Sequence, residues 1–99
     1  MSTQLAVEED VTIVFKKPGK YKVILLNDDH TPMEFVIELL IGIFGKTPGE
    51  AESITLQVHE NGNGIAGVYF YEIAEQIVYE AINISRNNGF PLSFNIEEE

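Results

Sequence analysis

The apolar run YKVILL at residues 21–26 constrains the fold more than any other segment of the chain. Its aromatic and β-branched side chains predict a strand, and the run is apolar enough to lie in the middle of a sheet. The polar residues Asn27, Asp28 and Asp29 end it abruptly. The chain therefore places a polar loop at the end of a central strand, where polar groups can converge on a ligand.

Two helix-start signals follow this loop. The segment TPME at 31–34 offers a capping threonine, a proline suited to the first helical position and a glutamate that can close a capping box. The segment TPGE at 47–50 repeats the signal. We expect the first helix to end at Gly45 and the second to end near residues 59–60.

The rest of the chain predicts two more strands and a third helix. The turn sequence NGNG at 61–64 precedes a predicted strand at 65–70. An apolar stripe over 73–82 predicts a helix that ends at 87–89, and alternation over 92–97 predicts the last strand. The order β-α-α-β-α-β indicates an α/β (α+β) sandwich, with three helices packed on one side of a three-stranded sheet.

Length and composition set bounds on this chain. Its 99 residues, 44% of them hydrophobic, predict one globular core at 21–99, preceded by a flexible extension at 1–20. The absence of cysteine excludes a disulfide framework and a thiolate zinc site. No apolar run approaches the ~20 residues of a membrane span, and no leader pattern opens the sequence. We therefore expect a cytoplasmic monomer without a membrane partner.

The net charge of -10 limits the classes of partner. It arises from 16 acidic and 6 basic residues. Such a surface disfavours nucleic acid and anionic membranes, which attract lysine and arginine. Cationic partners, including free α-amino groups, are favoured instead, although charge of this kind also keeps a small domain in solution. We expect no nucleic-acid partner.

The polar loop allows more than one interpretation. Asp28 and Asp29 could simply form a turn, because Asx side chains often bond nearby backbone amides. With His30 and His59 they could hold a metal, although the spacing of the two histidines matches no local ligand motif. Catalytic signatures such as GxSxG, a cysteine nucleophile or a phosphate-binding glycine loop are absent from the sequence. We expect neither an enzyme nor a metal or cofactor, and a hydrolase built on Asp28, Asp29 and His59 is the rival hypothesis.

Three segments of the chain resemble the ClpS family, the bacterial N-end-rule adaptors of the ClpAP protease. They are YKVILLNDDHTPMEFVIELL, LQVHENGNGIAGVYFYEIAE and NNGFPLSF, within residues 20–97. The resemblance implies an adaptor that recognises a destabilising N-terminal Leu, Phe, Tyr or Trp and delivers its protein to a ClpA-type AAA+ unfoldase. The sandwich also resembles the C-terminal domain of the ribosomal stalk protein, so an interaction domain that does not bind N-degrons is the alternative.

The same resemblance implies a binding site. Asn27, Asp28 and His59 match the residues that hold the ligand's α-amino group, a cation with three donors and no acceptor. The pocket walls and the contacts to the ligand's first backbone groups match six further positions. These are Asp29, Thr31, Met33, Thr55, Val58 and Leu92.

Three positions depart from the family pattern. Thr55 stands where many members have a methionine associated with gating the pocket against β-branched side chains. A looser preference that extends to Ile and Val is the expected result. His30 replaces a residue that is often tyrosine. Ile77 replaces a lysine of the unfoldase-docking surface, whereas Glu72 is retained on that surface.

Overall fold

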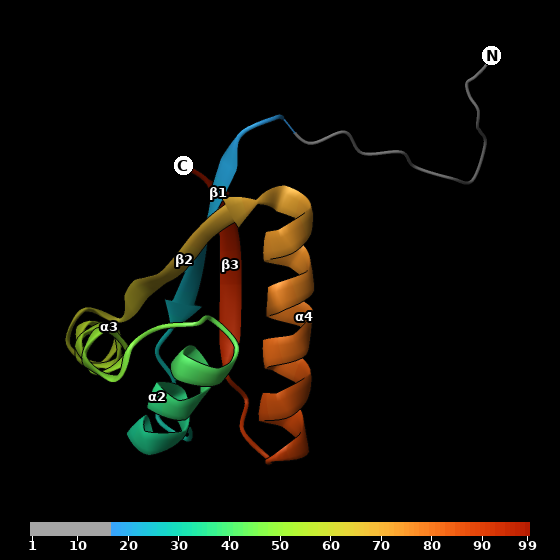
Figure 1. The fold of residues 1–99 in the computed structure, drawn as a ribbon. Helices are drawn as coiled ribbons and strands as arrows, with labels where there is room; N and C mark the ends of the chain where they lie inside the picture. Colours follow the sequence, from blue (N-terminus) through green and yellow to red (C-terminus); the bar gives the residue numbers. More distant parts are fainter. Residues whose placement is uncertain (1–16) are drawn as a thin grey trace.

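The computed structural model describes residues 17–99, and the elements follow the predicted order (Figure 1). Residues 1–16, most of the expected extension, lie outside the described residues. The elements are β1 (Lys20–Leu26), α2 (Met33–Gly42), α3 (Pro48–Asn61), β2 (Asn63–Phe70), α4 (Tyr71–Asn87) and β3 (Ser93–Glu98). A three-stranded sheet with three helices confirms the predicted sandwich.

Strand β1 lies in the centre of the sheet, as its apolar run predicted. The strand order is β2-β1-β3, and both pairings are antiparallel. Leu26 at the end of β1 lies opposite Asn63 in β2 and Ser93 in β3. The polar loop therefore leaves the sheet at the end where β2 and β3 begin. Helices α2 and α3 lie together near that end of the sheet (Figure 1).

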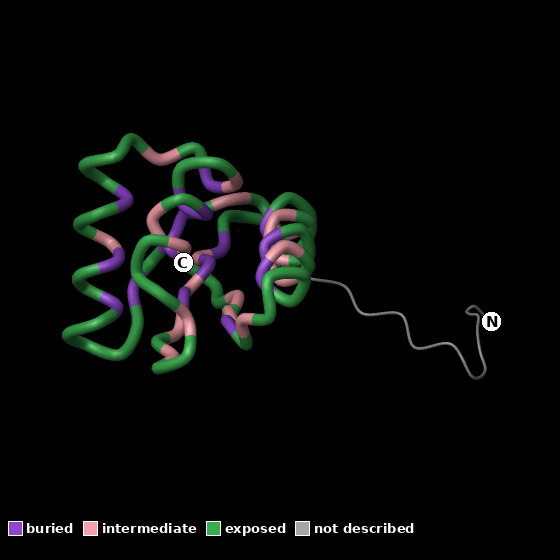
Figure 2. Tube along the Cα trace, turned by 90° about the horizontal axis from the view of Figure 1, so that it is seen from below, coloured by how far each residue is buried: buried purple, intermediate pink, exposed green. Residues whose placement is uncertain are grey.

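Alternate side chains of β1 face the helices. Tyr21, Val23 and Leu25 are at most 4% exposed. Figure 2 shows buried residues on the sides of α3 and α4 that face the centre of the domain. The core that contains Val23 and Leu25 also draws on the helices, on the turn after α2 and on the segment before β3. Its members there include Val36, Leu39, Leu40, Phe44, Ala51, Val58, Ala74, Ala81 and Leu92.

Helix α3 begins as predicted. Thr47 is its N-cap: the threonine side chain accepts the backbone N–H of Glu50, and the Glu50 carboxylate accepts the backbone N–H of Thr47. The hydrogen bond that the Thr47 backbone N–H donates to the carboxylate holds the pKa of Glu50 below its ordinary value, because it stabilises the charged form. The reciprocal bonds form the capping box that the TPGE sequence predicted.

The prediction for the start of α2 was wrong. The N-cap is Pro32 rather than Thr31, and no side chain caps this helix. Proline therefore precedes the first helical position, and Glu34 closes no capping box. The Thr31 hydroxyl donates to Oδ2 of Asp28 instead, so it is engaged by the loop rather than by the helix.

Two boundaries differ by a few residues from prediction. Helix α2 ends at Gly42, and Gly45, the expected end, lies in the following turn with φ of 68°. Strand β2 begins at Asn63 rather than 65. Gly62 explains this early start, because it ends α3 in the left-handed region with φ of 90° and reverses the chain by itself.

Helix α4 packs on the sheet through small residues. Ala74, Ala81 and Ser85 are fully buried, whereas Ile73, which was expected in the apolar stripe, is 50% exposed. The buried Ser85 hydroxyl donates to the Ala81 carbonyl at 2.8 Å, which satisfies its polar group. Neither this 17-residue helix nor any other within residues 17–99 is long and apolar enough to cross a membrane.

Candidate functional site

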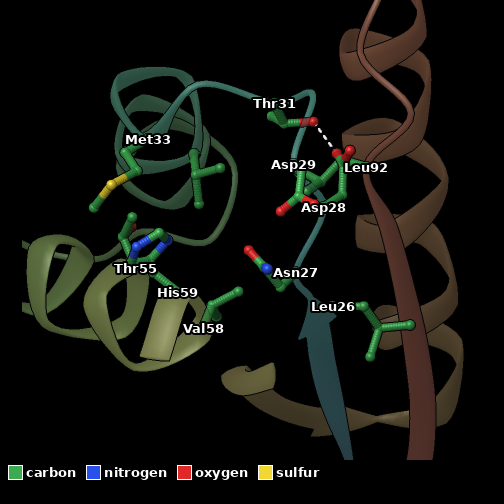
Figure 3. Close-up of a pocket in the computed structure, with 11 residues that line it drawn as sticks. Leu26, Asn27, Asp28, Asp29, Thr31, Met33, Thr55, Val58, His59 and Leu92 are labelled. Carbon is green, nitrogen blue, oxygen red and sulfur yellow. Dashed lines mark hydrogen bonds between the residues drawn. The ribbon is translucent and has the colours of Figure 1, made fainter. Parts of the chain in front are cut away.

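A cavity of about 220 Å³ lies where β1 ends (Figure 3). This volume is below the roughly 300–1,000 Å³ that is usual for sites of drug-sized ligands, so it suits a single side chain. The polar loop, the start of α2, one face of α3 and the segment before β3 enclose it. The lining residues are Leu26, Asn27, Asp28, Asp29, Thr31, Met33, Val36, Thr55, Val58, His59 and Leu92.

All nine residues that the sequence placed in the amine site and the pocket line this one cavity. Glu72, which was expected on a partner surface, does not line it. Leu26 and Val36 were missed as lining residues. For Val36 a signal was present, because it follows Met33 by three residues and so lies on the same face of α2.

Asp28 organises the loop between β1 and α2. Its Oδ1 accepts the backbone N–H of His30 at 2.9 Å, and its Oδ2 accepts the Thr31 hydroxyl. The backbone N–H of Asn27 donates to the Gly62 carbonyl at 2.9 Å, which ties the loop to the end of α3. An ionised carboxylate has about four lone-pair sites. The turn that Asp28 forms is therefore compatible with an additional bond to a cation.

Polar acceptors gather on one side of the cavity. The side chains of Asn27 and His59 project toward the same space, which Asp28 and Asp29 also border (Figure 3). The described lining residues include no lysine or arginine. Carboxylates, an amide oxygen and an unprotonated imidazole nitrogen together form an acceptor set that suits an ammonium group.

The remaining wall of the cavity is apolar. Val36, Val58 and Leu92 are at most 6% exposed, and Met33 is 37% exposed at the entrance. Thr55 is 3% exposed, and its hydroxyl donates to the Ala51 carbonyl one turn earlier, at 2.7 Å. The Thr55 hydroxyl proton is therefore committed to its own helix, and the wall is less polar than the residue type suggested.

The histidines and carboxylates do not form the cluster that the metal hypothesis required. Within residues 17–99, no group of three or more His, Asp or Glu side chains could hold a metal ion. His30 is exposed and lies outside the cavity lining.

The sequence matches known protease adaptors along most of its length. The family of the ATP-dependent Clp protease adaptor protein ClpS matches residues 16–95. The Clp protease adapter protein ClpS of Gluconobacter oxydans is 51% identical over 84 residues, which cover 85% of this chain and 71% of the relative. The ClpS protein of Clostridium acetobutylicum is 48% identical over 100 residues, which cover 99% of each chain.

A solved structure shares the fold. Agrobacterium tumefaciens ClpS2 bound to L-phenylalaninamide aligns with a TM-score of 0.80 and 37% sequence identity, over 84% of this chain and 100% of that chain. Fold, family match and relatives agree over the segment that carries the cavity. This chain therefore belongs to the ClpS family of ATP-dependent Clp protease adaptors, and it is an adaptor rather than an enzyme.

Proposed function

We propose that this adaptor, a cytoplasmic monomer, binds the free N-terminus of proteins that begin with Leu, Phe, Tyr, Trp, Ile or Val. It then delivers them to a ClpA-type AAA+ unfoldase. The observation that supports this most is a cavity with ammonium acceptors on one side and an apolar wall on the other. An N-terminal hydrophobic residue carries a cation and an apolar side chain on one carbon atom. L-Phenylalaninamide, the ligand of the related ClpS2, has the same two groups.

The α-amino group is held by three acceptors. The Asn27 side-chain oxygen, the Asp28 carboxylate and an unprotonated nitrogen of His59 each accept a hydrogen bond from one of its N–H groups. Bonds of this kind are charge-assisted, and they are about twice as strong as neutral ones. An acetylated or internal residue offers no such cation and is rejected, since it would leave these acceptors without their partner.

The rest of the first residue meets the loop and the apolar wall. Asp29 and Thr31 border the cavity beside the acceptors, where they can contact the ligand's first backbone groups. Met33, Val58 and Leu92 contact its side chain. Burying a Leu or Phe side chain there contributes about 1.5–3 kcal/mol.

A titration of the full chain with labelled peptides tests this function. A Leu-starting peptide should bind, and its acetylated twin should bind on the order of a hundredfold more weakly, because hydrogen bonds to a charged group are lost. A chelator should change neither affinity. Equal binding of the two peptides contradicts amine recognition. If neither peptide binds, the chain is an interaction domain of another kind. Binding that a chelator abolishes, together with peptide turnover, indicates a hydrolase.

The pH dependence of the same titration tests His59. Protonation of an imidazole on acidification removes its ring acceptor and places a cation beside the ligand's cation, so binding should weaken as the pH falls below neutral. The chain has one other histidine, His30, which is exposed and outside the cavity lining. His30→Gln should keep the pH dependence, and His59→Gln should remove most of it. A flat wild-type profile contradicts the role of His59.

Thr55 sets the breadth of specificity. It is buried and lines the cavity, and its side chain is shorter than the methionine that many family members carry there. The space that this leaves accommodates the second branch of an Ile or Val side chain. Differences of one or two methyl groups in an apolar pocket change selectivity about 10- to 200-fold.

Thr55→Met should therefore weaken the binding of Ile-starting peptides at least about tenfold relative to the binding of Leu-starting peptides. Thr55→Val is the matched control, because it keeps the branched shape and lacks only the hydroxyl that bonds Ala51. This control should still bind Ile-starting peptides. Two results together contradict the proposal: the wild type does not bind Ile-starting peptides, and Thr55→Met does not change the ratio of the affinities for Ile- and Leu-starting peptides.

Delivery requires a second surface, and Glu72 at the start of α4 offers one. Its neighbours Phe70 and Ile73 are 61% and 50% exposed. Exposed apolar side chains beside a charge are typical of protein-binding patches. Ile77 is partly buried and packs against the core, so it supplies no equivalent of the expected lysine. Docking on the unfoldase therefore depends on the patch around Glu72.

Glu72→Lys should weaken binding to a ClpA-type unfoldase about tenfold or more, because reversing a charge places it against the partner's complementary group. Affinity for Leu-starting peptides should stay within twofold of wild type. Glu80→Lys is the control, since Glu80 is also exposed on α4 and the net charge changes equally. An equal effect of both variants would indicate a general charge effect rather than a docking site.

A further inference from the structure

We propose that Arg86 is a positioning residue for the binding pocket, although it does not line the cavity. Its guanidinium holds Leu92 in the apolar wall, and it thereby influences which N-terminal side chains bind. The inference rests on the proposed recognition of N-terminal residues and deepens it.

Arg86 fastens the segment between α4 and β3. One guanidinium nitrogen, Nη1, donates to the Phe90 carbonyl at 3.0 Å and to the Leu92 carbonyl at 2.8 Å. Pro91 between them has no N–H with which to anchor the segment itself. The two bonds from Arg86 therefore fix both sides of the turn that leads into β3.

These bonds are not a helix cap. The backbone N–H of Asn88 already donates to the carbonyls of Ile84 and Ser85, and its side-chain amide donates to Ile84 as well. The Gly89 N–H donates to the Arg86 carbonyl. The carbonyls of Ile84, Ser85 and Arg86 thus have partners, and the guanidinium reaches beyond the helix to the segment that follows it.

The fastened segment supports the pocket in two ways. Leu92 is 1% exposed and forms part of the cavity wall. The Phe90 ring packs edge-on against the Phe35 ring of α2, with centroids 4.8 Å apart and planes at 60°. Helix α2 also carries Val36 of the cavity lining. Arg86 therefore acts on the wall directly through Leu92 and indirectly through Phe90.

Arginine suits this role better than lysine. Both bonds come from Nη1, which lies one bond further from the backbone than the ammonium nitrogen of a lysine would. The guanidinium is also planar and rigid, whereas a lysine ammonium is a compact charge on a flexible stem. Arg86→Lys keeps the net charge but does not hold both carbonyls in place. The Leu92 wall then becomes mobile, and a large first side chain that packs against it loses more affinity than a smaller one.

The test measures Kd for Leu- and Phe-starting peptides with the full chain. Arg86→Lys should raise Kd five- to tenfold for the Phe-starting peptide. The ratio of the Kd values for the Phe- and Leu-starting peptides should change at least threefold. Discrimination between the free and acetylated Phe peptide should be unchanged, because the acceptors for the amine are untouched.

Ile84→Val is the matched control, since Ile84 lies on the same helix, packs against the core and does not line the cavity. It should lower Tm as a purely structural change does and leave every Kd within twofold of wild type. Kd values for Arg86→Lys that match this control, with the same Phe-to-Leu ratio, overturn the proposal.

Methyl NMR of the peptide-free proteins separates this inference from the proposed function. Arg86→Lys should shift or broaden the Leu92 methyl resonances, and Ile84→Val should not. If wild type binds no peptide, the proposed function fails, while these spectra still decide whether Arg86 positions Leu92. Unchanged Leu92 resonances in Arg86→Lys overturn the positioning role.

Discussion

The two hydrogen bonds that the Asp28 carboxylate accepts determine how the chain leaves its central strand. Strand β1 ends at Leu26 and α2 begins at Met33 without a side-chain cap, so the loop between them is held by Asp28 through His30 and Thr31. The same carboxylate borders the cavity. Because these bonds use only part of its acceptor capacity, one residue can both shape the loop and bind a cation.

The sequence predicted the elements well where the interactions are local. The TPGE signal at 47–50 became a capping box, in which Thr47 and Glu50 bond each other's backbone N–H groups. The same signal at 31–34 did not, because Asp28 lies three residues before Thr31 and takes its hydroxyl. Helix-start signals are therefore reliable only when the flanking residues are considered with them, since short polar side chains have several partners available.

The site was predictable to the extent that it resembles a family. The spacing of Asn27, Asp28 and His59 does not by itself bring them together, and the resemblance supplied that grouping. Whether Leu26 lines the cavity depends on how the helices and strands approach one another. The spacing of apolar residues along the sequence does not encode this. The bonds of Arg86 to two carbonyls also have no sequence signature, because any residue supplies such an acceptor.

Locating the first side chain of a bound peptide tests the central claim most directly. In a complex of the full chain with a Leu-starting peptide, we expect intermolecular NOEs from the peptide's leucine methyls to the methyls of Val58 and Leu92. These two residues line the cavity at the end of β1. NOEs to Ile65 and Val68, exposed residues of β2 outside the cavity lining, with none to Val58 or Leu92, would contradict it.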